Sequence, residues 1–460
     1  MTPVAPCSFR DPEGSVLRRE GRILRRVEPA AAARLRAFLG SPLGQALAAE
    51  GAVIETWELP EGGDGAVWFE HRRVRFPSYP YEWSPAMLHA AAAHTIDLAC
   101  RLHEAGYGLK DGTPYNILFE KGRPVLVDVL SIEPRTPGDS VWRPLAQFAS
   151  TFLLPLALNR TCGLPLASLL LNQREGIAPE TAWKQLSWTA RLRRPFLGLV
   201  TLPELLRRLG LVKESHYAAT PGGDPEKARF VLGYRFRRLR RQVAALAPRA
   251  NAESNWTGYM GHLSYAEAEF QRKLNFTAAS LAESRPRRVL DAGCNTGAFS
   301  LQAARAGASV VAIDSDEAVV DHLWRAAAAE GLDILPLAVN LAHPTPATGW
   351  RNSECDSFLQ RAEGAFDMVL MLAVIHHLMV TERIPIGEIL ALAALLTRRD
   401  AVIEYVDPAD PMFRTIVRGR EHLHTDFNLI AFERAATAHF TVERRETINA
   451  TRTIFHLRKR

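Results

Sequence analysis

The order of apolar and polar residues predicts that strands and helices alternate along the second half of the chain. Short apolar runs return at regular intervals from residue 288 onward, with helical periodicity between them. The expected strands cover 288–290, 308–313, 335–339, 366–372 and 401–404, and further apolar runs cover 440–442 and 453–457. This alternation is typical of a doubly wound α/β sheet, whose ligands bind at the carboxyl ends of the strands.

The first half has a different order of elements, which predicts an α+β domain. The expected elements are a hairpin over 8–27, a helix over 29–49, strands over 53–58 and 66–76, and a long helix over about 85–105. Residues 142–209 are expected to be mostly helical. The apolar run 148–158 within them contains Pro155 and is too short to span a bilayer, so we expect a buried helix there.

A glycine turn follows the first expected strand of the second half. Gly293 and Gly297 bracket this turn, a helix follows it, and the next strand ends at Asp314. Such a turn places backbone N–H groups beside a ligand, and the acid on the neighbouring strand can accept hydrogen bonds from a ribose. A dinucleotide site needs glycine where this chain has Asn295, and Asp291 would repel a phosphate. The turn therefore suits a ligand with a ribose and an ammonium group but no phosphate.

This segment resembles the first motif of the class I methyltransferases, which use S-adenosylmethionine as the methyl donor. The resemblance implies a Rossmann-like α/β domain whose last two strands form an antiparallel pair at the sheet edge. It also implies that the cofactor is bound by Asp291, Gly293, Asn295, Gly297, Asp314 and Asn340. Asn340 falls where the family contacts the adenine edge. The alternative is an ordinary α/β turn that binds nothing.

The candidate catalytic residues, His376 and His377, follow the fourth expected strand of this half. The carboxyl end of that strand lies on the cofactor side, so both histidines are expected at the cleft or its rim. Methyl transfer mainly requires alignment of the acceptor, and a base is needed only if the acceptor must lose a proton, which suits histidine. Alternatively, one histidine caps the next helix and the other packs. Cys294 lies inside the turn and is not a convincing nucleophile.

An aromatic segment precedes the first strand of the second half. Its recurring residues are Trp256, Tyr259, Tyr265, Phe270 and Lys273. In class I methyltransferases a segment at this place often closes over the cofactor, so the resemblance implies a lid. A packed amphipathic helix is the alternative.

A second set of candidate residues follows the long helix of the first half. Asp111 precedes Asn116 by five residues, and Asp128 ends a short apolar strand. The order resembles the catalytic loop of protein kinases and aminoglycoside phosphotransferases, in which the first aspartate orients a hydroxyl and the other two residues hold magnesium. The chain departs from this pattern, because Leu109 replaces the usual histidine and we find no glycine-rich phosphate loop.

Three interpretations of this loop stay open: a degenerate kinase-like domain that does not phosphorylate, an active phosphotransferase, and a coincidental arrangement. We favour the first, because a kinase needs its phosphate cradle as well as its metal-binding acids. With the second half included, the chain resembles a bacterial methyltransferase family in which a kinase-like domain precedes the class I domain.

Composition limits the remaining possibilities. The chain has 460 residues, which suggests two to three domains, and a net charge of +6, which permits anionic partners without establishing nucleic-acid binding. A basic helix over 226–246 is either a nucleic-acid or anionic-substrate contact or a solvated connector with Phe230, Tyr234 and Leu239 packed inward. The five scattered cysteines suit a reducing cytoplasm, and no Cys/His spacing suits zinc, so no metal is expected.

These observations predict three segments: a kinase-like, acceptor-recognition domain over 1–215, a basic linker helix over 216–250 and a methyltransferase domain over 251–460. The predicted function is transfer of a methyl group from S-adenosylmethionine to an oxygen or nitrogen atom of a small-molecule, saccharide or macromolecular acceptor. The alternatives are an active phosphotransferase fused to a methyltransferase, and a binding protein with two inactive enzyme-like domains. We expect a cytoplasmic, bacterial protein without a membrane span.

Overall fold

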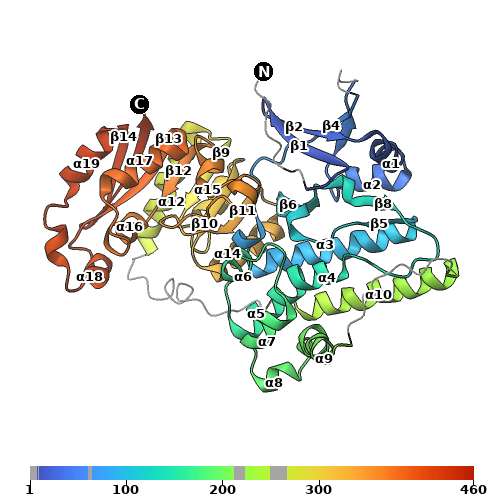
Figure 1. Ribbon diagram of the computed structural model, residues 1–460. Helices are drawn as coiled ribbons and strands as arrows, with labels where there is room; N and C mark the ends of the chain where they lie inside the picture. Colours follow the sequence, from blue (N-terminus) through green and yellow to red (C-terminus); the bar gives the residue numbers. More distant parts are fainter. Residues whose placement is uncertain (1–7, 9, 61–64, 212–222, 249–266) are drawn as a thin grey trace. The chain divides into compact units, whose positions relative to one another are not determined.

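The computed structural model describes residues 8, 10–60, 65–211, 223–248 and 267–460. The chain divides into two compact units, Met1–Arg249 with Ser353–Cys355, and Ala250–Asn352 with Asp356–Arg460. They are called unit 1 and unit 2, in chain order (Figure 1). Of the expected lid residues, Trp256, Tyr259 and Tyr265 lie outside the described residues.

Unit 2 is built on a seven-stranded sheet in the order β11-β10-β9-β12-β13-β15-β14. Its strands are β9 (Arg288–Ala292), β10 (Ser309–Asp314), β11 (Ile334–Ala338), β12 (Phe366–Met371), β13 (Thr397–Val406), β14 (Phe440–Asn449) and β15 (Arg452–Lys459). The strands from β9 to β13 run parallel, whereas β15 pairs antiparallel with β13 and β14. The predicted doubly wound sheet with an antiparallel edge pair is therefore confirmed.

The helices of unit 2 connect these strands and cover their apolar side chains. They are α12 (Glu267–Ser284), α13 (Ala298–Arg305), α14 (Glu317–Glu330), α15 (Phe358–Ala362), α16 (Ile375–Val380), α17 (Ile386–Leu396), α18 (Pro411–Val417) and α19 (Leu429–Thr437). The central parallel strands read as nearly continuous apolar runs because both faces of the sheet are buried. This packing fixes the carboxyl ends of β9, β10 and β12 side by side, where a ligand would lie.

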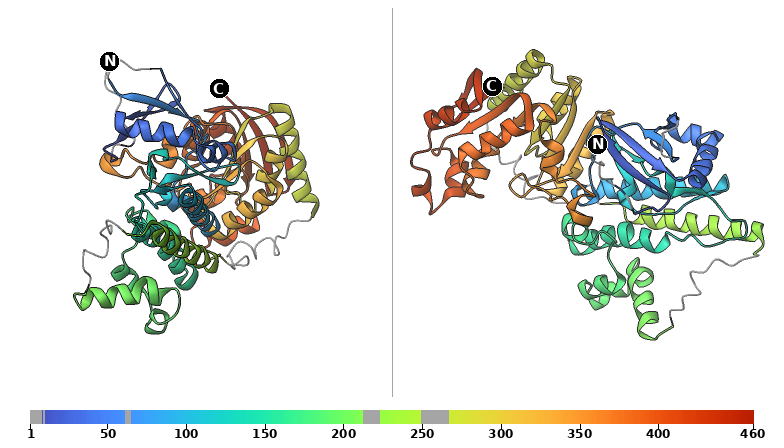
Figure 2. Two further views of the ribbon diagram at one scale, coloured as in Figure 1. Left: turned by 90° about the vertical axis from the view of Figure 1, so that its right-hand side faces the viewer. Right: turned by 45° about the horizontal axis from the view of Figure 1, so that its top comes forward.

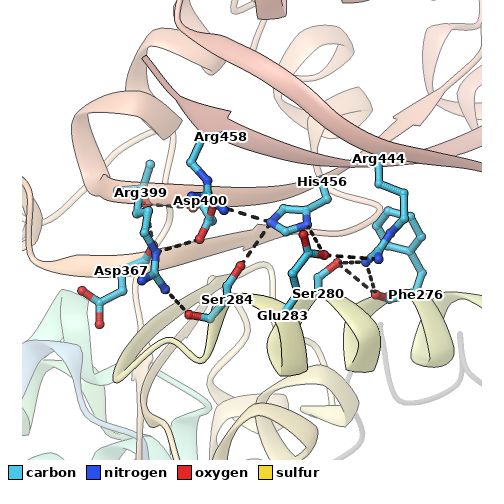
Figure 3. A network of polar contacts seen from close by, with 11 residues as sticks. Phe276, Ser280, Glu283, Ser284, Asp367, Arg399, Asp400, Arg444, His456 and Arg458 are labelled. Atoms are coloured by element: carbon cyan, nitrogen blue, oxygen red, sulfur yellow. Dashed lines mark hydrogen bonds and ion pairs between the residues drawn. The ribbon is translucent and has the colours of Figure 1, made fainter.

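A buried polar network fastens the second half of α12 to the antiparallel edge of the sheet (Figure 3). Arg444 of β14 donates a hydrogen bond to the Ser280 hydroxyl at 2.8 Å, and the Ser284 hydroxyl lies 3.3 Å from Nε2 of His456 on β15. Asp400 of β13 is fully buried and lies 2.6 Å from the Arg458 guanidinium. The network holds α12 in place, and α12 carries two residues of the candidate site.

Asp400→Asn tests the contribution of this network to stability. We expect a loss of about 1.5–3 kcal/mol at neutral pH, because charged hydrogen bonds are replaced by neutral ones. Burial acts to raise the pKa of Asp400, but hydrogen bonds from His456 and Ser284 and the charge of Arg458 outweigh it and lower the pKa.

The pH dependence follows from this lowered pKa. A carboxylate with a lowered folded-state pKa stabilises the fold above about pH 4, and this contribution disappears as pH falls further. Urea unfolding should therefore show a difference between wild type and Asp400→Asn that narrows below about pH 4. Glu433→Gln, which removes an exposed ion pair with Arg445, should cost less than about 1 kcal/mol. Equal losses for both variants would contradict the assignment.

Unit 1 has a four-stranded antiparallel sheet in the order β1-β2-β4-β3, formed by β1 (Gly14–Arg19), β2 (Arg22–Val27), β3 (Thr56–Glu58) and β4 (Val67–His71). The helix expected over 29–49 is two helices, α1 (Pro29–Leu39) and α2 (Pro42–Ala49). The break has a local cause, because the Ser41 hydroxyl caps α2 by accepting a hydrogen bond from the Gly44 N–H at 3.0 Å.

The rest of unit 1 follows the long helix α3 (Pro85–Glu104). It comprises β5 (Tyr107–Leu109), the hairpin of β6 (Ile117–Glu120) and β7 (Arg123–Leu126), β8 (Ile132–Pro134), α4 (Leu145–Phe148), α5 (Leu154–Cys162), α6 (Leu166–Leu170), α7 (Pro179–Gln185), α8 (Trp188–Arg191) and α9 (Leu202–Arg208). Two π-helical turns, Ala149–Leu153 and Leu197–Thr201, lead into α5 and α9. No helix among the described residues is long and apolar enough to cross a membrane.

The basic helix α10 (Pro225–Ala245) belongs to unit 1 and packs along α3. Its buried residues include Leu232, Phe236 and Leu239, at spacings of four and three that form one helical face. The expectation that Phe230 and Tyr234 pack inward is wrong, because these side chains are 69% and 52% exposed. They lie on the other side of the helix from the Leu232 face.

Candidate active site

A cavity of about 700 Å³ lies at the carboxyl ends of the parallel strands of unit 2. Its wall is formed by residues that follow β9, β10, β11 and β12, together with side chains of α12, β13, α18 and β15. Its lining residues include Phe270, Lys273, Gly293, Asn295, Asp314, Asn340, His377, Glu382, Glu404 and Arg452. Five of them were predicted as site residues from the sequence: Gly293, Asn295, Asp314, Asn340 and His377.

The glycine turn after β9 has the backbone conformation that its sequence predicts. Gly293, Asn295 and Gly297 have φ angles of 75°, 48° and 90°. Residues other than glycine and asparagine rarely adopt this backbone region. A Cβ on Gly297 would lie 2.2 Å from a methyl group of Leu323. The N–H of Gly293 donates to the Ile313 carbonyl oxygen at 2.8 Å, which ties the turn to β10. Glycine is therefore required at 297 for close packing, although Gly297 itself does not line the cavity.

Asp314 ends β10 and faces the same cavity. Its carboxylate accepts hydrogen bonds from the backbone N–H of Asn295 at 2.9 Å and of Asp316 at 3.1 Å. Burial raises the pKa of Asp314. The two backbone donors fix the orientation of the carboxylate, and each oxygen keeps a lone pair for a ligand hydroxyl.

Asp291 occupies a different environment from the one expected. It lies inside β9, in register with Ala312 of β10, rather than just past the strand end. The side chain is 1% exposed and accepts a hydrogen bond from the Ser300 hydroxyl at 2.5 Å. Burial raises the pKa of Asp291 to about 6. The residue lies beneath the turn and links β9 to α13, and it does not form part of the cavity wall.

The two histidines on α16 also differ in position. His377 lines the cavity, whereas His376 does not. His376 is 1% exposed, and neither of its ring nitrogens has a hydrogen-bond partner among the described residues. Burial, with the positive charge of Arg452, lowers the pKa of His377, so this imidazole is neutral at neutral pH and can accept a proton. Only His377 is placed to reach a ligand in the cavity.

The cavity wall contains a group of buried charges, of which the sequence pattern indicated only Lys273, as part of the expected lid. Lys273 of α12 lies 2.6 Å from Oε1 of Glu404, and the Arg452 guanidinium donates to the same oxygen at 3.2 Å. Arg452 also donates to both carboxylate oxygens of Asp410, at 2.7 and 3.0 Å. Burial lowers the pKa of Lys273. The available signal was the occurrence of Glu404 and Arg452 at the ends of apolar strands.

Asn340 and Phe270 complete the parts of the wall that the sequence indicated. Asn340 follows β11, and its side-chain oxygen accepts a hydrogen bond from the Ala342 N–H at 2.9 Å, which fixes the amide at the cavity. Phe270 of α12 lines the cavity and packs edge-on against Phe299 of α13, with ring centroids 6.0 Å apart.

The kinase-like residues of unit 1 lie together after α3. One of them, Asp128, already forms an ion pair with an arginine of the same unit. The Asn116 amide is 3.4 Å from Oδ2 of Asp128, and the Arg25 guanidinium on β2 is 2.8 Å from Oδ1 of Asp128. Burial raises the pKa of Asp111, and the charge of Asp128 adds to this shift. Among the described residues, no cluster of three or more His, Cys, Asp or Glu side chains is arranged to hold a metal.

Comparison with known proteins agrees with the class of fold. Residues 231–451 match the family model described as a methyltransferase domain. The chain is 30% identical over 440 residues to the nodulation protein NoeA of Rhizobium meliloti (strain 1021). This alignment covers 93% of this chain and 90% of that protein. A shorter match, 35% identical over 89 residues, covers 19% of this chain and 30% of the ubiquinone biosynthesis O-methyltransferase of Caulobacter vibrioides (strain ATCC 19089 / CIP 103742 / CB 15).

Among solved structures, the N-methyltransferase NodS from Bradyrhizobium japonicum WM9 in complex with S-adenosylhomocysteine is 13% identical. It covers 45% of this chain and 99% of that chain, with a TM-score of 0.32. The match to the methyltransferase-domain model, on the sheet described above, makes unit 2 a class I methyltransferase that uses S-adenosylmethionine. The chain as a whole belongs to the family of the nodulation protein NoeA.

Proposed function

We propose that the enzyme transfers the methyl group of S-adenosylmethionine to an oxygen or nitrogen atom of an acceptor bound in the cavity of unit 2. The observation that supports this proposal is the meeting of three features at one cavity: the glycine turn, the Asp314 carboxylate and the neutral imidazole of His377. In-line displacement requires that the donor and the acceptor are bound side by side in one cavity. The reaction between them is then effectively unimolecular.

In this proposal one half of the cavity binds the cofactor and the other half binds the acceptor. Asp314 accepts hydrogen bonds from the cofactor ribose, Gly293 and Asn295 approach the cofactor with their backbone, and Asn340 lies along the adenine edge. Asp291 acts indirectly, because its bond to Ser300 holds α13 and thereby the turn. The cofactor supplies a methyl group on a positively charged sulfur.

The acceptor half is formed by His377 and the group of Lys273, Glu404 and Arg452. The acceptor's lone pair forms the new bond to the methyl carbon while the carbon–sulfur bond breaks, and its electron pair stays on the sulfur of S-adenosylhomocysteine. The proton of the acceptor hydroxyl or amine passes to the His377 imidazole, which is neutral at neutral pH. The match to an O-methyltransferase supports oxygen as one acceptor atom.

We further propose that unit 1 is a kinase-like domain that recognises the acceptor and does not transfer phosphate. The ion pair of Arg25 with Asp128 supports this role, because a fixed guanidinium already neutralises the carboxylate that would otherwise bind magnesium. Saccharides, other small molecules and macromolecules are the candidate classes of acceptor.

Calorimetry with S-adenosylhomocysteine tests the cofactor site. We expect the wild-type chain to bind the ligand and Asp314→Ala to bind about 1–3 kcal/mol more weakly, because a charged hydrogen-bond acceptor is removed. Asp316→Ala is the matched control, since Asp316 caps α14 through the Ala318 N–H at 2.8 Å and does not line the cavity. Absence of binding to folded wild type, or equal weakening in both variants, would contradict the proposed cofactor site.

A further inference from the structure

Exposed apolar side chains concentrate in one short segment of unit 1. The described residues include sixteen large hydrophobic side chains that are exposed, and eight of these lie between residues 188 and 211. This segment contains α8, the π-helical turn Leu197–Thr201 and α9. Figures 1 and 2 show α7, α8 and α9 grouped at the end of unit 1 farthest from its four-stranded sheet. Such a concentration on a folded surface marks an interaction site.

The apolar side chains of α9 follow a helical stripe that faces away from the protein. Leu202, Leu205, Leu206 and Leu209 are spaced by three, one and three residues, and their exposures are 51%, 42%, 45% and 68%. On most surface helices this stripe packs against the core. Here the four leucines are exposed, and the carboxylate of Glu204, which is 2% exposed, lies under the side chains of Arg207 and Arg208. The helix α9 therefore presents its leucines to the surroundings instead of packing them against the core.

Basic side chains outnumber acidic ones around this stripe. Residues 184–211 contain six basic residues, Lys184, Arg191, Arg193, Arg194, Arg207 and Arg208, and a single acidic residue, Glu204. Arg207 and Arg208 both bond Glu204, at 2.8 and 2.7 Å, yet their own side chains remain 58% and 52% exposed. The Glu204 carboxylate thus orients two guanidinium groups, and the surface around the leucines carries a net positive charge.

We propose that the surface formed by residues 188–211, the α9 surface, docks onto anionic lipid bilayers. The leucines and Trp188 would enter the boundary between headgroups and acyl chains, and the arginines would pair with lipid phosphates. Leucine and tryptophan next to arginine are the side chains that suit this boundary. A helix that docks in this way lies in the plane of the membrane, so no spanning helix is needed.

Charge complementarity favours a lipid surface over a second copy of the chain. A symmetric dimer places the same patch on both sides of the interface, so the arginines of one copy would face those of the other. An anionic bilayer supplies phosphate groups at high density instead. The proposal does not depend on the methyl acceptor, because it concerns unit 1 and a surface remote in sequence from the cavity residues.

Vesicle co-sedimentation of the full chain tests this proposal. We expect binding to vesicles made of equal parts phosphatidylcholine and phosphatidylglycerol, and much weaker binding to pure phosphatidylcholine. The triple variant Leu202→Ser, Leu206→Ser and Leu209→Ser should lose at least about tenfold in affinity, because the apolar surface that enters the lipid is removed. Each of Arg193→Gln and Arg194→Gln should cost roughly fivefold, and added salt should weaken binding further.

Control variants distinguish binding through this surface from non-specific binding through other exposed apolar side chains. Phe230→Ser with Tyr234→Ser removes two aromatic side chains of α10 that are equally exposed, and it should leave vesicle binding unchanged. Thermal unfolding and affinity for S-adenosylhomocysteine should match wild type in all these variants, because the altered side chains are exposed and distant in sequence from the cavity. Either no wild-type binding to anionic vesicles at low salt or an equal loss in the α10 control would overturn the proposal. Sedimentation as a dimer that the leucine variant dissociates, without vesicle binding, would assign the surface to self-association instead.

Discussion

Glu404→Ala is expected to lower the free energy of unfolding of unit 2 by about 3–5 kcal/mol, because it removes the buried carboxylate that two buried cations share. Glu404 is fully buried, and its Oε1 is bonded by both Lys273 and Arg452. Arg452 retains Asp410 in the variant, so Lys273 carries most of the loss. For a domain of this size we expect the thermal midpoint to fall by roughly 6–20 °C in scanning calorimetry.

The pH dependence distinguishes this electrostatic cause from a simple cavity. Burial lowers the pKa of Lys273, and Glu404 opposes that shift, so removal of Glu404 should lower the pKa further. A lysine with a lowered folded-state pKa binds fewer protons than the unfolded chain, and stability therefore rises with pH. The loss caused by Glu404→Ala should then be smaller at pH 9 than at pH 7.

A matched control is available at the same cavity. Glu382 also lines it, but its side chain is 28% exposed and its partner His343, at 3.0 Å, is 74% exposed. Glu382→Ala should therefore cost less than about 1 kcal/mol. A loss for Glu404→Ala that is equally small, or one that does not change with pH, would show that the buried charges are compensated in another way.

His377→Asn is expected to lower the rate of methyl transfer by about 10²–10⁴-fold for an acceptor that must lose a proton, while binding of S-adenosylhomocysteine is kept. The asparagine preserves polarity and approximate size but cannot take the proton. The measurement is formation of S-adenosylhomocysteine from S-adenosylmethionine with a pool of hydroxyl- and amine-bearing acceptors. An unchanged rate would assign His377 a packing role.

The pH dependence of the wild-type rate is a second test of His377 as the base. Burial and the charge of Arg452 lower the pKa of His377, so the imidazole stays deprotonated down to pH values below its ordinary pKa of about 6.5. The rate should be level at neutral pH and fall only as the solution becomes more acidic. His376→Phe is the control, because His376 is buried outside the cavity wall and phenylalanine keeps its shape. This variant should retain the wild-type rate within about tenfold.

The sequence by itself determined the architecture of unit 2 and the position of its glycine turn. Apolar runs separated by helical stretches specify a parallel sheet, because strands buried on both faces need apolar side chains throughout. Gly293, Asn295 and Gly297 could be interpreted locally, since the conformational demands of a tight turn act on those residues alone. Asp314 followed from the turn, because adjacent parallel strands end at the same edge of a sheet.

Only the tertiary structure decided how the remaining site residues are used. The neighbours His376 and His377 have the same chemistry, and the packing of α16 alone places one in the core and the other at the cavity. Lys273, Glu404 and Arg452 come from an α-helix and two strands far apart in sequence, so no local pattern could predict their contact. The same holds for Arg25 and Asp128 of unit 1, and for the outward direction of the α9 leucines. Periodicity defines the face of a helix, whereas the long-range packing of the chain determines what that face meets.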